Sequence, residues 1–97
     1  MFRRNRKTRE FRLTCFSASD AANQALTSED IRDAILRHQR GDWGSVDRQT
    51  RRENDNALRL GDGPLLSIFE TTDGIRFSVE STRFHTFAKI ELLDRSS

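Results

Sequence analysis

The chain has 97 residues, of which 34% are hydrophobic and 33% charged, and its formal net charge is +2. This length is typical of one domain, and no apolar run approaches the roughly 18 residues of a membrane helix. The basic start is not followed by the apolar stretch of a secretory signal, so we expect a cytoplasmic protein with no membrane partner. Cys15 is the single cysteine; it lies in an alternating segment, where we expect a small buried thiol.

Positive charge is concentrated at the start of the chain. The first nine residues carry five basic side chains and no acid, namely Arg3, Arg4, Arg6, Lys7 and Arg9. The other 12 basic residues face 15 acidic ones, which leaves the rest of the chain with a net charge of −3. We expect residues 1–9 to form a disordered basic arm and residues 10–95 to form the domain. The arm is either a solvated terminus or a segment that follows a phosphate backbone, with binding that weakens in salt.

The first half of the domain reads as a strand and two helices. Alternation over residues 10–16 predicts a short strand, and Ser17 with Asp20 resembles a capping box that starts a short helix. Thr27 or Ser28 is expected to cap a second helix, which Gly41 then ends. Residues that share the apolar face of this second helix are Ile31, Ala34, Ile35 and His38.

The second half reads as one helix and three strands. Asp47 is an N-cap candidate for a charged and largely exposed helix over residues 47–60, which the Gly61–Pro64 segment breaks. Strands are predicted over residues 65–71, 75–81 and 83–93, and the Asp73-Gly74 pair indicates a hairpin. The fold class is therefore α+β, with N-terminal helices packed on one face of a three- to four-stranded antiparallel sheet around one hydrophobic centre. The first strand is expected at an edge.

The Gly41-Asp42-Trp43-Gly44 turn and the preceding His38 bring unlike functional side chains together. At a helix C-terminus His38 can act as a general acid or base. The structural interpretation, which we favour, is that His38 bonds the turn backbone, Asp42 caps the turn or the next helix, and Trp43 anchors the core. The turn would then lock the second helix to the third.

Arg51 and Asn54 lie one turn apart on the third predicted helix. A polar pair at this spacing can contact a ligand or phosphate. The alternative, which we favour, is that Asn54 pins the backbone of the Gly41–Gly44 turn by accepting and donating hydrogen bonds.

Basic residues also lie on or beside the final strands, with Phe87 among them: Arg76, Arg83, His85 and Lys89. This pattern predicts a sheet face for RNA or single-stranded DNA, unless it is an ordinary exposed face. Glu80 and His85, with Arg76 or Arg83, also have the side chains used by barnase- and RelE-like endoribonucleases, by analogy of fold.

The segment of residues 36–76 carries a spaced pattern, RHxxGDWG, then R..N..AL, then LLS and DG-R. It comprises Arg37, His38, Gly41, Asp42, Trp43, Gly44, Arg51, Asn54, Ala57, Leu58, Leu65, Leu66, Ser67, Asp73, Gly74 and Arg76. The pattern resembles a family of small bacterial proteins often encoded on plasmids or other mobile elements. The resemblance covers less than half the chain and implies fold and genetic context rather than an activity. After Glu80 the sequence departs from the late polar segment of that family.

Motifs for common enzyme chemistry do not occur in the sequence. It contains no phosphate-binding loop, dinucleotide fingerprint, zinc-ligand spacing or nucleophile elbow, so we expect no cofactor and no metal. The leading hypothesis is a non-enzymatic binding domain that engages RNA, DNA or a nucleic-acid-processing protein. An endoribonuclease toxin and a protein-binding inhibitor of a host system remain the alternatives, and the oligomeric state stays open.

Overall fold

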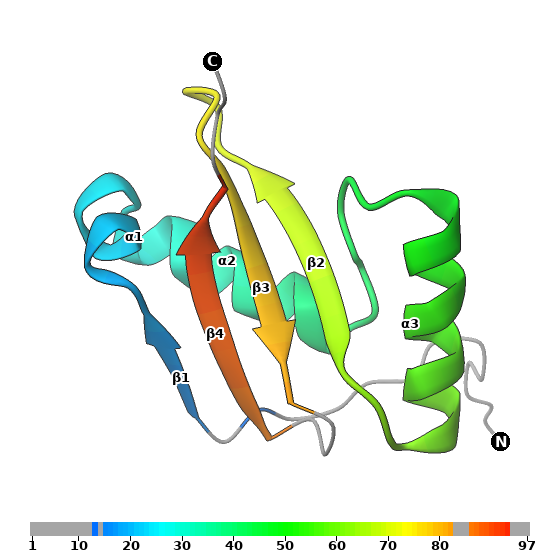
Figure 1. The fold of residues 1–97 in the computed structure, drawn as a ribbon. Helices are drawn as coiled ribbons and strands as arrows, with labels where there is room; N and C mark the ends of the chain where they lie inside the picture. The colour runs from blue at the N-terminus through cyan, green and yellow to red at the C-terminus, as the bar shows by residue number, and fades with distance from the viewer. Residues whose placement is uncertain (1–12, 14, 83–85, 94–97) are drawn as a thin grey trace, which may run out of the picture.

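The structure is a computed structural model, and it describes residues 13, 15–82 and 86–93. In chain order the elements are β1 (Cys15–Ala18), α1 (Asp20–Ala25), α2 (Ser28–Gln39), α3 (Arg48–Leu60), β2 (Leu65–Glu70), β3 (Arg76–Ser81) and β4 (Phe87–Leu92). Three helices therefore precede three strands within the described residues (Figure 1). The predicted α+β class is confirmed.

The four strands form one mixed sheet in the order β1-β4-β3-β2. The strands β2, β3 and β4 form the predicted antiparallel meander, and Leu65 of β2 lies opposite Ser81 of β3. The short strand β1 lies at the predicted edge but runs parallel to β4, so a fully antiparallel sheet was the wrong expectation. The three helices and two further strands lie between β1 and β4, and such a long connection allows either direction of pairing.

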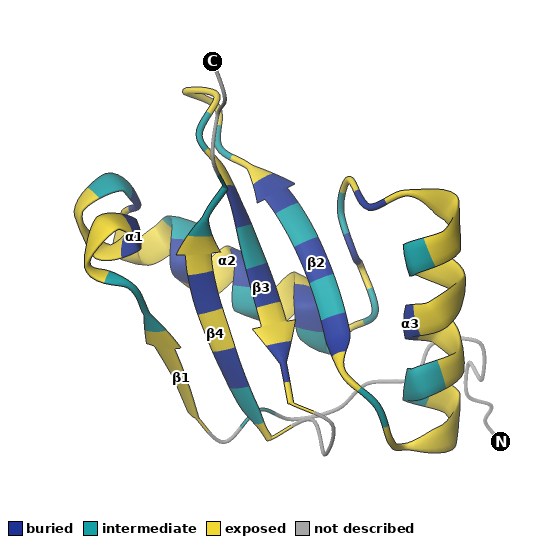
Figure 2. Ribbon diagram, viewed as in Figure 1, coloured by how far each residue is buried: buried dark blue, intermediate teal, exposed yellow. Residues whose placement is uncertain are grey.

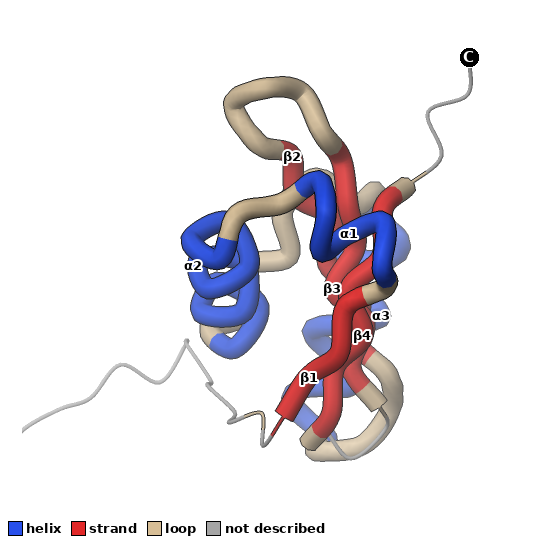
Figure 3. The backbone as a smooth tube through the Cα atoms, turned by 90° about the vertical axis from the view of Figure 1, so that its left-hand side faces the viewer, coloured by secondary structure: helices blue, strands red, loops and turns tan. Residues whose placement is uncertain are grey.

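Helices α1 and α2 cover one face of the sheet, and α2 lies clearly to one side of it in Figure 3. The main hydrophobic cluster forms there, because Ile31 and Ala34 of α2 meet Phe77, Val79 and Ile90 of the sheet. Along the strands, buried and exposed positions alternate, as Figure 2 shows on β3 and β4. The predicted inward face of α2 is thus the buried one.

Helix α3 lies beside the β2 edge instead of on the face that α2 covers (Figure 1). A second hydrophobic cluster fills this place, with Trp43, Val46 and Leu65 buried and Ala57 and Leu58 of α3 packed against them. The expectations of one hydrophobic centre and of all helices on one face are therefore wrong for α3. A strongly charged helix has too few apolar side chains to cover a sheet face.

The chain between α2 and α3 extends the sheet edge. The backbone N–H of Ile68 donates to the carbonyl of Trp43 over 3.0 Å, and the N–H of Ser45 donates to the carbonyl of Ile68 over 2.8 Å. Gly44 forms an isolated parallel bridge with Ile68 and has a φ of 73°. A Cβ atom at Gly44 would overlap the carbonyl oxygen of Ile68, so only glycine allows this approach.

Most element boundaries follow the predicted capping residues. Thr27 and Asp30 form a capping box at the start of α2, Asp47 caps α3, and Gly61 ends α3 in the left-handed conformation. The beginning of the domain differs, because Ser19, not Ser17, caps α1. Ser17 belongs to β1, where it pairs with Lys89.

Cys15 is exposed rather than buried, so that expectation was wrong. The reason is that β1 is a four-residue edge strand whose only neighbouring strand in the described sheet is β4. In the part of the chain that the structure describes, no helix has the length and apolar character needed to cross a membrane.

Candidate functional site

Trp43 is part of the core rather than of a surface site. Its exposed fraction is 1%, and its indole N–H donates to Oδ1 of Asp55 over 2.9 Å. The ring meets His38 edge-on, with centroids 5.5 Å apart. The prediction that Trp43 is buried is confirmed, but Asp55 as its partner was missed, because nothing in the spacing distinguishes this aspartate from its charged neighbours.

His38 is completely buried, with an exposed fraction of 0%. Nδ1 lies 2.5 Å from Oγ of Ser67 on β2, and Nε2 lies 3.0 Å from Oγ of Ser81 on β3. The two ring nitrogens thus meet hydroxyls from two strands, which we did not predict, while the backbone carbonyl of His38 accepts from the N–H of Gly41 in the turn over 3.1 Å. Ser67 lies between Leu65 and Phe69 on the inward face of β2. The polar group of His38, Ser67 and Ser81 therefore lies between the two hydrophobic clusters. A general acid or base must reach a substrate, and His38 does not.

Asp42 stays at the surface of the turn. Its Oδ2 accepts from Nε of Arg37 over 2.8 Å, and its Oδ1 accepts from the backbone N–H of Gly44 over 3.2 Å. The hydrogen bond from Arg37, followed by that from Gly44, lowers the pKa of the Asp42 carboxyl, although partial burial acts in the opposite direction. Asp42 thus caps the turn, as we predicted, through its hydrogen bond with Gly44.

Asn54 is buried on the inward face of α3, whereas Arg51 is exposed. The Asn54 amide donates to the carbonyl of Leu66 over 2.7 Å and accepts from the N–H of Leu66 over 3.1 Å. We predicted this pair of bonds but assigned them to the wrong backbone, since they pin β2 and not the turn. The Asn54 side chain therefore makes the two backbone hydrogen bonds that a neighbouring strand would otherwise make with Leu66. This contact lies two residues from the bridge between Gly44 and Ile68.

The outward face of the sheet mixes both signs of charge. Within the described residues it carries Glu70, Arg76, Glu80, Lys89 and Glu91, all of them exposed. In the strand register Arg76 lies opposite Glu70, and Lys89 lies opposite Glu80. Nζ of Lys89 also lies 3.9 Å from Oε2 of Glu91. Among these side chains acids outnumber bases, so this part of the sheet is not a basic surface.

The predicted nuclease residues are only partly placed. Arg83 and His85 lie outside the described residues. Arg76 and Glu80 share the outward face of β3, but four residues of a strand separate their Cα atoms by about 13 Å. This spacing does not bring the two side chains to one reacting atom.

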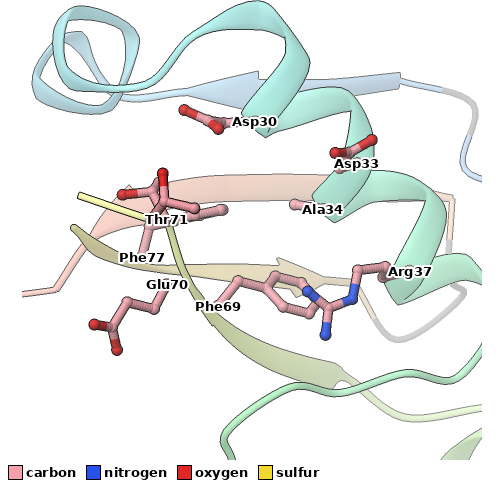
Figure 4. Close-up of a pocket in the computed structure, with 9 residues that line it drawn as sticks. Asp30, Asp33, Ala34, Arg37, Phe69, Glu70, Thr71 and Phe77 are labelled. Carbon is pink, nitrogen blue, oxygen red and sulfur yellow. The ribbon is translucent and has the colours of Figure 1, made fainter. Parts of the chain in front are cut away.

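A pocket opens between α2 and the end of the β2–β3 hairpin (Figure 4). Asp30 and Asp33 of α2 line it, and the guanidinium of Arg37 lies over the ring of Phe69, 4.5 Å from its centroid. With Glu70 also in the lining, carboxylates outnumber the single arginine, which is unfavourable for a phosphate. No group of three or more metal-ligating side chains suited to an ion occurs among the residues that the structure describes.

The outward face of α3 carries a basic ridge that the sequence analysis missed. At about 100° per residue, four side chains fall within roughly 80° of one another, opposite the buried Asn54. They are Arg48, Arg52, Asn56 and Arg59, all exposed. We call these four residues the α3 ridge. The signal for it in the sequence is the spacing of i, i+4, i+8 and i+11, which places polar residues as well as apolar ones on one face of a helix.

The two acidic residues of α3 lie to either side of the ridge and are both engaged. Oε2 of Glu53 accepts from Nε2 of Gln49 over 3.1 Å, and Asp55 accepts the indole proton of Trp43. No ion pair joins a ridge arginine to an acid within the described residues. A shallow concavity lies on this face, lined by Arg48, Gln49, Arg52, Glu53 and Asn56. The ridge thus presents positive charge and hydrogen-bond donors to solvent.

The five basic residues of the arm lie outside the residues that the structure describes, so the site is built without them.

Models of known protein families, curated proteins and solved structures were compared with the chain, and none of them matched it.

Proposed function

We propose that the chain is a small, non-enzymatic nucleic-acid-binding domain. The observation that carries the proposal is the α3 ridge, where three arginines and one asparagine face solvent without an acidic partner among the described residues. Arginine donates two parallel hydrogen bonds to a phosphate and keeps its charge at any physiological pH. All four basic residues of α3 are arginines.

The first half of the ridge is unfavourable for the helix itself, which supports a role outside the fold. Arg48 and Arg52 are like charges at i and i+4, a spacing that costs roughly 0.2–0.5 kcal/mol. Both lie in the first half of α3, near the positive end of its macrodipole, and the first turn contains no acid. A bound polyanion would remove both penalties.

The arm and the genetic context extend the proposal. Arg3, Arg4, Arg6, Lys7 and Arg9 would add sequence-independent phosphate contacts to those of α3. The resemblance of residues 36–76 to plasmid-associated proteins supports a mobile-element origin. The nuclease alternative has no comparable support, since Arg76 and Glu80 lie far apart on β3.

Two variants of equal charge test the proposal. One replaces Arg48, Arg52 and Arg59 with glutamine; the control replaces Arg32, Arg40 and Arg76, which are exposed on other surfaces. Affinity for mixed-sequence DNA and RNA is measured by fluorescence anisotropy between about 50 and 200 mM salt. We expect the wild-type affinity to fall steeply with salt, and the ridge variant to lose affinity and about 3 units of the log–log salt slope.

The control variant is expected to retain most of both quantities, because only overall charge changes. Equal losses in the two variants would overturn the assignment to α3. Absence of binding to every nucleic acid by wild-type protein at the lowest salt would overturn the function itself.

A further inference from the structure

The geometry points to duplex DNA as the ligand: we propose that α3 enters the major groove, where Arg52 and Asn56 contact base edges. This inference rests on the proposed function and adds to it the form of nucleic acid and the groove. It is carried by how far α3 stands out from the rest of the fold. Only Asn54 of its 13 residues is buried, and in Figure 2 its outer surface is exposed along the whole helix.

The dimensions of α3 match those of the groove. A helix of 13 residues is about 20 Å long, and the ridge from Arg48 to Arg59 spans about 16 Å. With side chains an α-helix is about 10–12 Å wide, and the major groove of B-form DNA is about 12 Å wide and 8.5 Å deep. Because α3 lies at the β2 edge, beside the sheet, its ridge faces away from the rest of the fold.

The order of side chains along the ridge suits a division of roles. Arg48 and Arg59 lie at its two ends, where phosphates flank the groove, and Arg52 and Asn56 lie between them. Arginine bonds the O6 and N7 atoms of guanine, and asparagine bonds the N6 and N7 atoms of adenine, in each case by two hydrogen bonds. Arg59 donates to Oδ1 of Asn56, a contact that orients the asparagine amide along the ridge.

The same geometry argues against an RNA duplex. The major groove of A-form RNA is deep and narrow, so a helix does not enter it. A single strand is recognised mainly by stacking on aromatic rings, and α3 contains none. The ligand that fits a protruding arginine-rich helix is B-form DNA.

The first measurement compares duplex DNA, duplex RNA of the same sequence and each single strand at one salt concentration. The DNA is a sequence that the 97-residue chain enriches from a random duplex pool. We expect at least about tenfold tighter binding to the DNA duplex, a ratio within the usual range for specific over non-specific sites. Equal or tighter binding to RNA or to a single strand would overturn the groove assignment while leaving nucleic-acid binding intact.

The second measurement removes single groove atoms from the enriched duplex. Substitution of 7-deazapurines deletes the N7 acceptors of the major groove, and substitution of inosine for guanine deletes the amino group of the minor groove. We expect about a fivefold or greater loss with 7-deazapurines, the effect of one base contact, and a smaller loss with inosine. A larger loss of affinity with inosine than with 7-deazapurines would place the protein in the minor groove. No loss of affinity with either substitution would mean that α3 contacts only phosphates. Either result would overturn the proposal.

Arg52→Lys separates base recognition from charge. Lysine keeps the positive charge but lacks the planar pair of donors. We therefore expect the variant to keep the wild-type salt slope, to bind the enriched duplex less tightly and to lose part of its sensitivity to 7-deazaguanine, because the lysine ammonium still reaches guanine N7. A variant that keeps the wild-type affinity, salt slope and sensitivity would overturn the two-bond contact of Arg52 with a guanine. If no nucleic acid binds at all, the proposed function fails first, so the two failures are distinguishable.

Discussion

The two faces of α3 differ in what they contact, although both are polar. On the inward face Asn54 bonds the backbone of β2, and Asp55 at its margin holds the indole of Trp43. On the outward face the α3 ridge has no acidic partner among the described residues. Polarity alone does not distinguish a structural face from a binding face. What distinguishes them is whether the polar groups bond other elements of the fold; on the ridge, the hydrogen bond from Arg59 to Asn56 joins only ridge residues.

This comparison predicts that stability and binding separate on one helix. Substitutions on the inward side and in the segment beneath it should change the free energy of unfolding. Substitutions on the ridge should change binding and leave the fold nearly unaffected, or even improve it.

The largest expected effect is at Trp43. Trp43→Ala removes the largest side chain of the second cluster and leaves Asp55 without the indole donor, and we expect a loss of about 3–5 kcal/mol in the free energy of unfolding. Urea denaturation followed by circular dichroism measures it. Leu60→Ala is the control, because Leu60 is 72% exposed and should change stability by less than about 0.5 kcal/mol. Similar losses in both variants would contradict the assignment of Trp43 to the core.

The two asparagines of α3 provide a matched pair with a smaller effect. Asn54→Ala leaves the N–H and carbonyl of Leu66 without their amide partners, which we expect to cost roughly 2–3 kcal/mol. Asn56→Ala makes the same chemical change on the ridge and should alter stability by less than about 0.5 kcal/mol. We expect the reverse ranking for DNA affinity, measured on the same two variants. If Asn56→Ala were the more destabilising, the division of α3 into two faces would be wrong.

Local signals explain what the sequence could predict about the fold. Thr27 with Asp30, Asp47 and Gly61 set helix ends through bonds within a few residues, and Asp73-Gly74 sets a hairpin in the same way. Such contacts depend on neighbouring residues alone. The direction of β1 and the position of α3 depend on long-range packing, which has no local signature.

The candidate site shows the same limit. The burial of Trp43 and the place of His38 on the apolar face of α2 followed from residue type and helical period, but the hydrogen-bond partners of His38, Trp43 and Asn54 did not. Ser67 and Ser81 reach His38 from two strands that lie 29 and 43 residues away in sequence. The ridge was visible in principle, because the spacing of Arg48, Arg52, Asn56 and Arg59 needs only the helix period; what required the structure was knowing that this side of α3 faces solvent.

The smallest expected effect has opposite signs at the two ends of the ridge. Arg48→Gln removes a like-charge pair with Arg52 and a positive charge from the first turn, so we expect unfolding to become about 0.5 kcal/mol less favourable. Arg59→Gln removes a positive charge from the last turn, where it interacts favourably with the macrodipole. We therefore expect the free energy of unfolding to fall by about 0.3 kcal/mol. Arginine and glutamine have similar helix propensities, so thermal unfolding at low salt isolates the charge. Both variants should weaken DNA binding; a ridge selected for stability would instead require Arg48→Gln to destabilise the fold.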